Sequence, residues 1–198
     1  FSCYKCFIEK NYPSINTCLL ENGESNWKIN FIPILIFSGN HFLIDVKKKL
    51  INLSNLNIHK TICLNEQILD TFKIKINGEI EQGKRVIVTV CSKSKKLNVY
   101  KSLEKYTGKI SKALRCNYHF SIDNTEIDEV TNKLKCLRDI ENFNLIIHPI
   151  FLFDGFLYQT LMGRFEKLNF KNIIITKPFL KEKKILDAVL NKINQDLI

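Results

Sequence analysis

Glycine is scarce in this sequence: seven occur in 198 residues, and none belongs to a Gly-rich phosphate-binding pattern. The P-loop and the dinucleotide-binding fingerprint both need glycines at fixed spacing, because the backbone must approach the phosphates closely. The sequence therefore excludes these two kinds of nucleotide site. It also lacks the eighteen or more consecutive apolar residues typical of a membrane-spanning helix, so we expect no membrane partner.

The N-terminal stretch FSCYKCFIEK has neither a signal-peptide pattern nor an initiator methionine. We therefore expect the chain to be a piece of a longer product.

Cysteine is present, but not in a disulfide-framework pattern. The seven cysteines are an odd number, and the Cys3-x-x-Cys6 pair has no second pair at zinc-site spacing. Most of the others lie in apolar runs, where free thiols behave as small buried hydrophobes. We expect free thiols and a reducing compartment, either the cytoplasm or a plastid stroma.

Positive charge is in excess, with a net charge of +10. Three interpretations are open: the Lys, Asn and Ile bias of an AT-rich genome, an anionic small-molecule substrate, or nucleic acid. The lysines are scattered and are not interleaved with aromatic residues, as a single-strand binding surface would require. We expect no nucleic-acid partner.

Short β-branched runs alternate with amphipathic stretches, which predicts βαβ units and parallel sheets. The pattern runs twice, with a polar, glycine-containing linker at 77–84 between the two runs. We therefore predict an α/β fold of two similar lobes, residues 1–80 and 81–198, each a small parallel β-sheet flanked by helices in flavodoxin-like or Rossmann-like layers. The expected strands are 3–9, 28–37, 59–64, 85–91, 117–122, 143–153 and 171–176. The expected helices are 13–22, 41–53, 65–74, 97–114, 126–137, 156–168 and 181–197.

An internal repeat supports the two lobes. Residues of the stretch around 33–39 recur at a constant offset of 116 positions, and at the same offset His41 corresponds to Leu157. The second lobe begins with a strand and helix, roughly 85–115, that have no counterpart in the first. We expect that the matching unit of the first lobe is missing from this chain. The recurring pairs are Pro33/Pro149, Ile34/Ile150, Phe37/Phe153 and Gly39/Gly155.

Two ionisable residues of the first lobe fall at carboxyl ends of expected strands, where ligands of open α/β sheets bind. Glu9 ends the strand 3–9, and His41 follows the strand 28–37 after a turn. A neutral imidazole and a carboxylate can hold a transition metal or take protons from a substrate. The alternative is that neither residue takes part in chemistry. Glu9 would then be a solvated residue at the end of a strand, and His41 would begin a helix and hydrogen-bond to the backbone.

The other histidines are weaker candidates. We expect His59 at the start of a strand, away from the carboxyl edge, His119 in or beside a strand, and His148 in the core or a subunit contact. Ser92 and Ser94 lie in a carboxyl-end loop of the second lobe, where an anionic group could bind.

The stretches CFIEKNYPSI and FIPILIFSGNHFLIDV resemble the sirohydrochlorin chelatases of the class II chelatase family. In that family a Phe-x-Glu strand end is followed by Pro-Ser, and a Pro-containing strand by Gly-x-His and an Asp. The second-lobe stretch HPIFLFDG resembles the degenerate C-terminal half of the long, two-lobed members. The matching positions are Phe7, Glu9, Pro13, Ser14, Pro33, Gly39, His41 and Asp45.

The resemblance implies a lyase that inserts Co²⁺ or Fe²⁺ into the anionic tetrapyrrole sirohydrochlorin, in cobalamin or siroheme biosynthesis. His41 and Glu9 would be the catalytic and metal-handling residues, and Ser38, Gly39 and Asn40 the substrate contacts. No organic cofactor is implied, and the protein would be a monomer or homodimer.

The family pattern also has an earlier histidine, in a Gly-His-Gly-Ser-Arg segment that this sequence does not contain. Two alternative functions therefore stay open. One is a two-lobed α/β protein that binds a small anion, and the other is a decayed, inactive relative of the chelatases.

Overall fold

The computed structural model describes residues 2–8, 11–22, 28–39, 41–50, 53, 55–59, 61, 66–80, 83–165 and 168–197. The chain divides into two compact units. The first consists of Phe1–Cys63 together with Ile193–Ile198, and the second is Leu64–Lys192.

The elements of the chain, in order, are α1 (Ile15–Asn22), β1 (Ile29–Phe31), the π-helix η1 (His41–Lys47), α2 (Lys48–Leu50), β2 (Leu56–Ile58), α3 (Glu66–Glu79), β3 (Lys84–Cys91), α4 (Leu97–Ala113), β4 (Tyr118–Asp123), α5 (Ile127–Lys135), the 3₁₀ turn η2 (Ile140–Asn142), β5 (Phe143–Pro149), α6 (Phe156–Phe165), β6 (Asn172–Ile175), the 3₁₀ turn η3 (Phe179–Lys181) and α7 (Lys183–Leu197).

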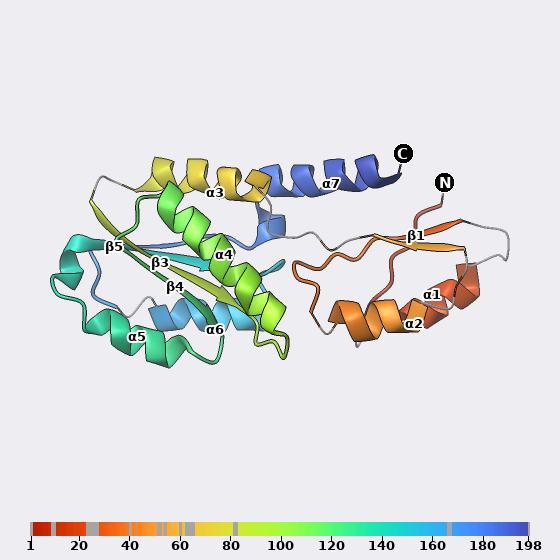
Figure 1. Ribbon diagram of the computed structural model, residues 1–198, viewed down its shortest axis with the longest axis horizontal. Coiled ribbons are helices and arrows are strands. Elements are labelled where there is room, and N and C mark those ends of the chain that lie inside the picture. The colour runs from red at the N-terminus through yellow and green to blue at the C-terminus, as the bar shows by residue number, and fades with distance from the viewer. Residues whose placement is uncertain are drawn as a thin grey trace. The chain divides into compact units, whose positions relative to one another are not determined.

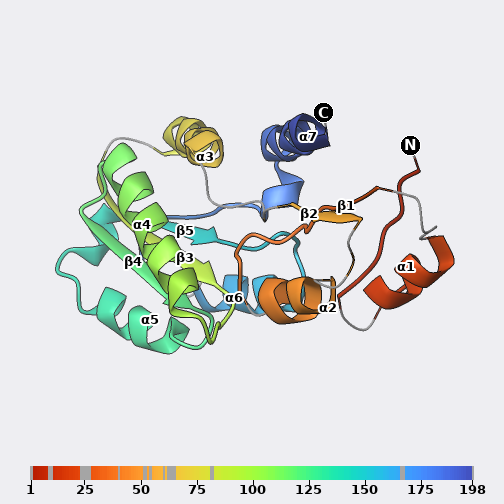
Figure 2. The same cartoon turned by 45° about the vertical axis from the view of Figure 1, so that its right-hand side comes forward.

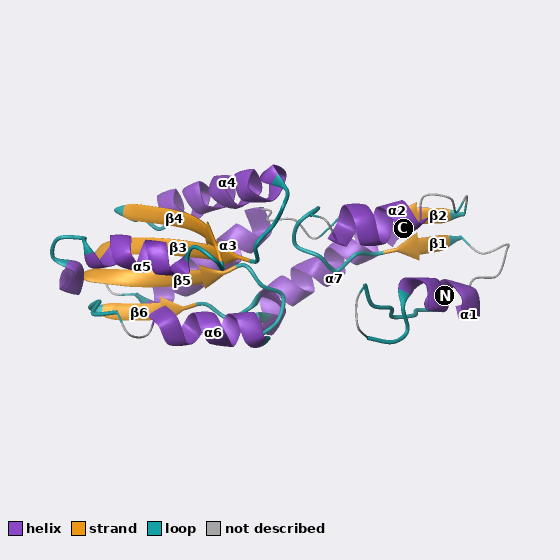
Figure 3. Ribbon diagram, turned by 90° about the horizontal axis from the view of Figure 1, so that it is seen from below, coloured by secondary structure: helices purple, strands orange, loops and turns teal. Residues whose placement is uncertain are grey.

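The second unit is built on a four-stranded sheet with the strand order β4-β3-β5-β6. Every pair in it is parallel, and the long central strand β3 pairs with β4 on one side and β5 on the other. Figure 3 shows the four strands side by side with their arrowheads at the same edge. Parallel strands need a crossover connection, and here helices supply it.

Helices cover both faces of this sheet, as Figure 1 shows for α4 and α5. Side chains alternate between the faces along β3, so Val86 and Val88 contact the core beneath α5 and α6, whereas Thr89 is hydrogen-bonded to Thr107 of α4. The strands are apolar on both faces because both faces are buried. The α5/α6 core consists of Val86, Val88, Val90, Ile122, Ile127, Val130, Leu134, Phe143, Leu145, Ile147, Leu161, Phe165, Leu168 and Phe170.

The first unit has a smaller parallel pair, β1 with β2, in which Phe31 lies beside Ile58. The buried cluster of this unit consists of Ile15 of α1, Val46 of η1 and Leu50 of α2. Phe31 and Ile58 pack against this cluster. Figure 2 shows β1 and β2 side by side in this unit. The cluster is small, so this unit has much less buried apolar surface than the second.

The predicted α/β fold with parallel sheets flanked by helices is confirmed. All strands and helices expected from residue 85 onward are present, with ends shifted by a few residues. Expected helix 65–74 is also present, and it extends to Glu79.

Several expectations for the first 64 residues were wrong in extent. The strand predicted at 3–9 is reduced, among its described residues, to a single bridge from Phe7 to Ser14. The strand predicted at 28–37 ends at Phe31, and Pro33, which has no N–H for a ladder, follows shortly after. Of the strand predicted at 59–64, the described residues 59 and 61 are not in a strand, and residues 60 and 62–64 lie outside the described residues; the structure has a strand directly before this stretch, at Leu56–Ile58.

The helix predicted at 41–53 begins as seven residues of π-helix, and three residues of α-helix follow. Helix α3, which the repeat assigned to the first lobe, belongs to the second compact unit. The lobes 1–80 and 81–198 are defined by sequence similarity rather than by contacts, and they stay a prediction.

No helix in the described parts of the chain is both long enough and apolar enough to cross a membrane.

Candidate functional site

The loops that follow β3, β5 and β6 lie at the carboxyl edge of the second sheet. Backbone hydrogen bonds tie them together beyond the strand ends: Ile150 N–H donates to the Val90 carbonyl over 2.7 Å, and Phe179 N–H to the Phe151 carbonyl over 2.9 Å. Segments 150–152 and 179–180 thus continue side by side after the strands have ended. This is the edge at which open α/β sheets bind ligands.

The loop after β3, residues 92–96, is held by Tyr100 and Asp123. The Tyr100 hydroxyl donates to Asp123 Oδ2 over 2.6 Å and accepts a hydrogen bond from the backbone N–H of Ser94 over 3.1 Å. Lys93 N–H donates to Asn124 Oδ1 over 2.8 Å. Because these two backbone donors have partners in α4 and directly after β4, they are not available to an anion.

The Asp123 carboxylate is ionised in this setting. Burial raises its pKa, but hydrogen bonds from Thr125 and Tyr100 and the nearby Lys93 outweigh burial, so that the pKa lies below its ordinary value. Next to it, burial above all and then the charges of Asp123 and Glu126 raise the pKa of the Cys91 thiol to about 12. Cys91 is therefore a protonated, unreactive thiol at neutral pH.

Large apolar side chains are exposed at the same edge. Leu97 begins α4 after the loop from β3, and it is 67% exposed; Phe153 and Phe156, after β5, are 62% and 83% exposed. Leu157 is exposed as well. We call Leu97, Phe153, Phe156 and Leu157 the apolar edge. Phe153, Phe156 and Leu157 are also neighbours in sequence, and clustered exposed apolar groups mark ligand or partner sites more often than single exposed residues do.

Lysines accompany the apolar edge. Lys93 and Lys95 are exposed in the loop after β3, and Lys177 and Lys181 are exposed after β6. Lys181 forms a surface ion pair with Asp154, with 3.4 Å between Nζ and Oδ2. The edge thus combines apolar surface with positive charge on flexible side chains.

In the first unit, the backbone of His41 begins η1 directly after the Gly39 turn region. Leu43 N–H donates to the Gly39 carbonyl over 3.0 Å, and Ser38 Oγ lies 3.1 Å from Thr61 Oγ1. Ser38 therefore lies beside the segment that follows β2. Leu157, the counterpart of His41 in the repeat, is the second residue of α6, so both positions are at the start of a helix that follows a strand.

The predicted residues Glu9 and Asn40 lie outside the described residues, and so does the side chain of His41. No distance between Glu9 and His41 follows from the structure. Their pairing stays a prediction.

His59 was wrongly expected at the start of a strand. It directly follows β2, at the carboxyl end, and its Nε2 lies 3.1 Å from Asn30 Oδ1 and 3.2 Å from Asn57 Nδ2. Its backbone N–H donates to the Phe31 carbonyl. The missed signal is the apolar spacing of Leu56 and Ile58, which places the strand before His59 rather than after it.

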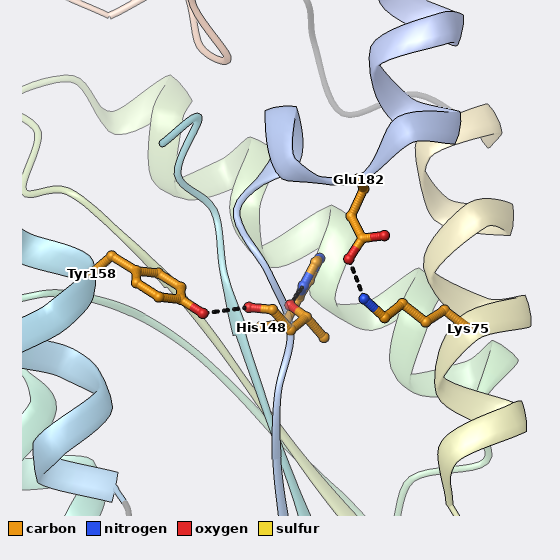
Figure 4. A network of polar contacts seen from close by, with 5 residues as sticks. Lys75, His148, Tyr158 and Glu182 are labelled. Atoms are coloured by element: carbon orange, nitrogen blue, oxygen red, sulfur yellow. Dashed lines mark hydrogen bonds and ion pairs between the residues drawn. The ribbon is translucent and has the colours of Figure 1, made fainter. Parts of the chain in front are cut away.

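His148 is a core residue, as one of the two sequence interpretations had it. It is completely buried, and burial, with a smaller contribution from Lys75, lowers its pKa to about 3. Figure 4 shows His148 near the ion pair of Lys75 with Glu182 and near Tyr158, whose hydroxyl donates to the Thr176 carbonyl over 3.2 Å. The imidazole is neutral, shielded from solvent and not positioned for a ligand.

Among the described residues, no group of three or more His, Cys, Asp or Glu side chains could hold a metal ion. Glu9 and His41, whose side chains are not among those described, stay the candidates from sequence.

No protein-family model and no curated protein sequence matches the chain. Two solved structures do. The structure of SirB from Bacillus subtilis with Fe³⁺ aligns with a TM-score of 0.75 and 18% identity over 96% of this chain and 80% of that one. The sirohydrochlorin chelatase SirB from Bacillus subtilis subspecies spizizenii, in complex with cobalt, aligns with a TM-score of 0.71 and 15% identity over 96% and 78% of the two chains. The chain therefore has the fold of the SirB chelatase structures, and the resemblance found in its sequence is confirmed at the level of that fold.

Proposed function

We propose that this protein is a sirohydrochlorin chelatase, which inserts Co²⁺ or Fe²⁺ into the tetrapyrrole as a step toward cobalamin or siroheme. The observation that carries the proposal is the SirB-like fold over 96% of the chain, together with a histidine that begins a helix after a strand and a Gly turn. Fold alone does not assign chemistry, so the site residues must be tested directly.

His41 and Glu9 are the proposed catalytic and metal-binding residues. A neutral imidazole and a carboxylate are suitable ligands for a divalent transition metal, and they can share it with the incoming pyrrole nitrogens. Insertion releases two pyrrole N–H protons for each metal ion. Glu9 is the proposed acceptor for these protons, directly or through water. Ser38, Gly39 and Asn40 are the proposed substrate contacts from the turn before His41.

The carboxyl edge of the second unit, taken by itself, has features that suit a tetrapyrrole better than a small anion. Sirohydrochlorin has a flat, largely apolar macrocycle surrounded by carboxylates. The apolar edge, with Phe153 and Phe156 exposed, suits the macrocycle, and Lys93 and Lys95 suit the carboxylates. A site for a small anion would need free backbone donors or a converging set of cations, and the backbone N–H groups of Lys93 and Ser94 already donate to Asn124 and Tyr100.

The test is an anaerobic insertion assay with sirohydrochlorin and either Co²⁺ or Fe²⁺, followed by absorbance. The variants are His41→Ala and Glu9→Ala, and His119→Ala is the matched control, because His119 is exposed near the amino end of β4. We expect metal-dependent insertion that falls by roughly 100-fold or more in His41→Ala, as expected for loss of a metal-handling or proton-transfer group, and that is unchanged in His119→Ala.

Two results would reject the proposal. If the tetrapyrrole binds but metal insertion does not exceed the uncatalysed rate, the protein is a carrier or an inactive relative. If the tetrapyrrole does not bind at all, the small-anion alternative gains support.

A further inference from the structure

Two cysteines of the first unit are close to one another, although twelve positions separate them in sequence. Phe7, next to Cys6, forms a parallel bridge with Ser14, and its N–H donates to the Pro13 carbonyl over 2.9 Å. Cys18 N–H in turn donates to the Ser14 carbonyl over 2.9 Å, at the first turn of α1. The bridge and the helix turn therefore bring the segment that contains Cys6 next to the first turn of α1, which contains Cys18.

The Cys6 and Cys18 side chains lie close enough for Cys18 to affect the ionisation of Cys6. Burial above all, and then Cys18, raise the pKa of the Cys6 thiol, so Cys6 keeps its proton. Both residues are free cysteines of intermediate exposure, and Cys6 packs against the small core cluster that includes Ile15. The pair is thus partly shielded, but solvent and small molecules can reach it.

We propose that Cys6 and Cys18 are a redox-active dithiol, which a small-molecule disulfide of the glutathione type converts reversibly into an intramolecular disulfide. The Cys18 thiolate attacks one sulfur of the small disulfide, and a mixed disulfide forms while one small thiol leaves. The Cys6 thiol then gives up its proton as its sulfur attacks the Cys18 sulfur, which forms the Cys6–Cys18 bond and releases the second small thiol. The two protein thiol protons pass to the two departing thiolates, so two thiols are oxidised and one disulfide is reduced.

Cys3 is not the partner of Cys6, although the two form a Cys-x-x-Cys sequence. Residues 2–6 contain neither a turn nor a bend, and residues three apart in such a chain have Cα atoms roughly 10 Å apart. A disulfide needs Cα atoms within about 7 Å. Cys3 is also exposed, whereas Cys6 and Cys18 are both of intermediate exposure.

The new bond would link the segment Cys6–Ile8 to α1. Glu9 directly follows this segment, so oxidation would restrict the backbone next to the carboxylate of the proposed function. The dithiol itself does not depend on that function, because it rests on the geometry of Cys6 and Cys18 alone.

The test is oxidation of the folded protein with glutathione disulfide, alkylation of the remaining thiols, and mass spectrometry of tryptic peptides. Trypsin cuts after Lys5, Lys10 and Lys28, so Cys6 is the single cysteine of peptide 6–10 and Cys18 that of peptide 11–28. We expect these two peptides to be recovered linked, with a loss of two hydrogens, and to separate again after dithiothreitol. Oxidation of the urea-unfolded chain should instead give mixed pairings.

Matched variants make the assignment specific. Cys18→Ser should abolish the linked product, whereas Cys3→Ser and Cys136→Ser, which replace exposed cysteines, should leave its yield unchanged. Far-UV circular dichroism of each variant checks that it is folded. Oxidised wild-type protein that shows only glutathione adducts, or a Cys3–Cys6 link in place of Cys6–Cys18, overturns the proposal.

Discussion

His148 on β5 and Thr176 directly after β6 are hydrogen-bonded in the core of the second unit, with 2.7 Å between Nδ1 and Oγ1. The other ring nitrogen, Nε2, lies 2.9 Å from the Tyr106 hydroxyl of α4. The ring also makes an edge contact with Phe72 of α3, at 4.1 Å between centroids. One neutral imidazole thus joins the sheet to two helices.

Acid should destabilise the second unit through His148. Its pKa is about 3 in the folded chain and 6.5 in the reference state, so the unfolded chain binds the proton more readily. The stabilisation is complete above pH 6.5 and is lost as pH falls from 6.5 toward 3, by about 1.4 kcal/mol for each pH unit. Urea unfolding monitored between about pH 7 and about pH 4 measures this slope.

The matched pair for this measurement is His148→Gln and His119→Gln. We expect His148→Gln to be less stable at neutral pH, by about 1–3 kcal/mol, but to have a flatter pH dependence. His119→Gln, at an exposed position, should keep the wild-type slope. An unchanged slope in His148→Gln would show that other groups cause the acid sensitivity.

Tyr100→Phe should loosen the loop after β3. The substitution removes the donor to Asp123 and the acceptor for the Ser94 N–H, and we expect a loss of about 1–2 kcal/mol of unfolding free energy. The pKa of Asp123 should rise, because a hydrogen bond that favours its charged form is lost. NMR titration of the carboxylate measures this change. Tyr118→Phe, at an exposed position, is the control; an equal effect there would contradict the argument.

Phe165→Ala and Phe156→Ala compare the loss of stability at a buried and at an exposed position of the same helix, α6. Phe165, at the end of α6, is completely buried, and its truncation should cost about 3–5 kcal/mol. Phe156, at the start of the same helix, is 83% exposed, and its truncation should cost less than about 0.5 kcal/mol. Thermal unfolding of both variants checks the difference. Equal losses would mean that Phe156 is covered in solution.

The lysines of the loop after β3 should contribute to tetrapyrrole affinity if the proposed function is right. Replacing Lys93, Lys95 and Lys96 by Gln should weaken binding of a carboxylated porphyrin roughly tenfold at low salt, and less at high salt, because exposed charges are screened. Porphyrin fluorescence titrations measure the affinity.

The control for the lysine variant is a triple substitution to Gln at Lys112, Lys133 and Lys135. These exposed lysines lie in the last turns of α4 and α5 and change the net charge equally. Equal weakening in both variants would indicate a general charge effect rather than binding at the apolar edge.

The sequence by itself determined the α/β fold and nearly the whole element order after residue 64. Apolar runs such as 86–90 and 145–147 are continuous because both of their faces are buried, and the amphipathic stretches between them have helical spacing. It also placed position 41, and its counterpart Leu157, at the start of a helix that follows a strand, which the structure confirms for the backbone. These features follow from local periodicity, which any short window of the sequence contains.

Only the tertiary structure decided which residues meet. The contact of Tyr100 with Asp123 joins residues 23 positions apart, and no spacing rule indicates it. The position of His59 after β2 depends on pairing with β1, because the register of a short strand is set by its partner rather than by its own composition. In the same way, the bridge from Phe7 to Ser14 brings the segment that contains Cys6 next to the start of α1, which contains Cys18. Contacts between distant residues depend on how the elements pack, and that information is distributed over the whole chain rather than contained in any one segment.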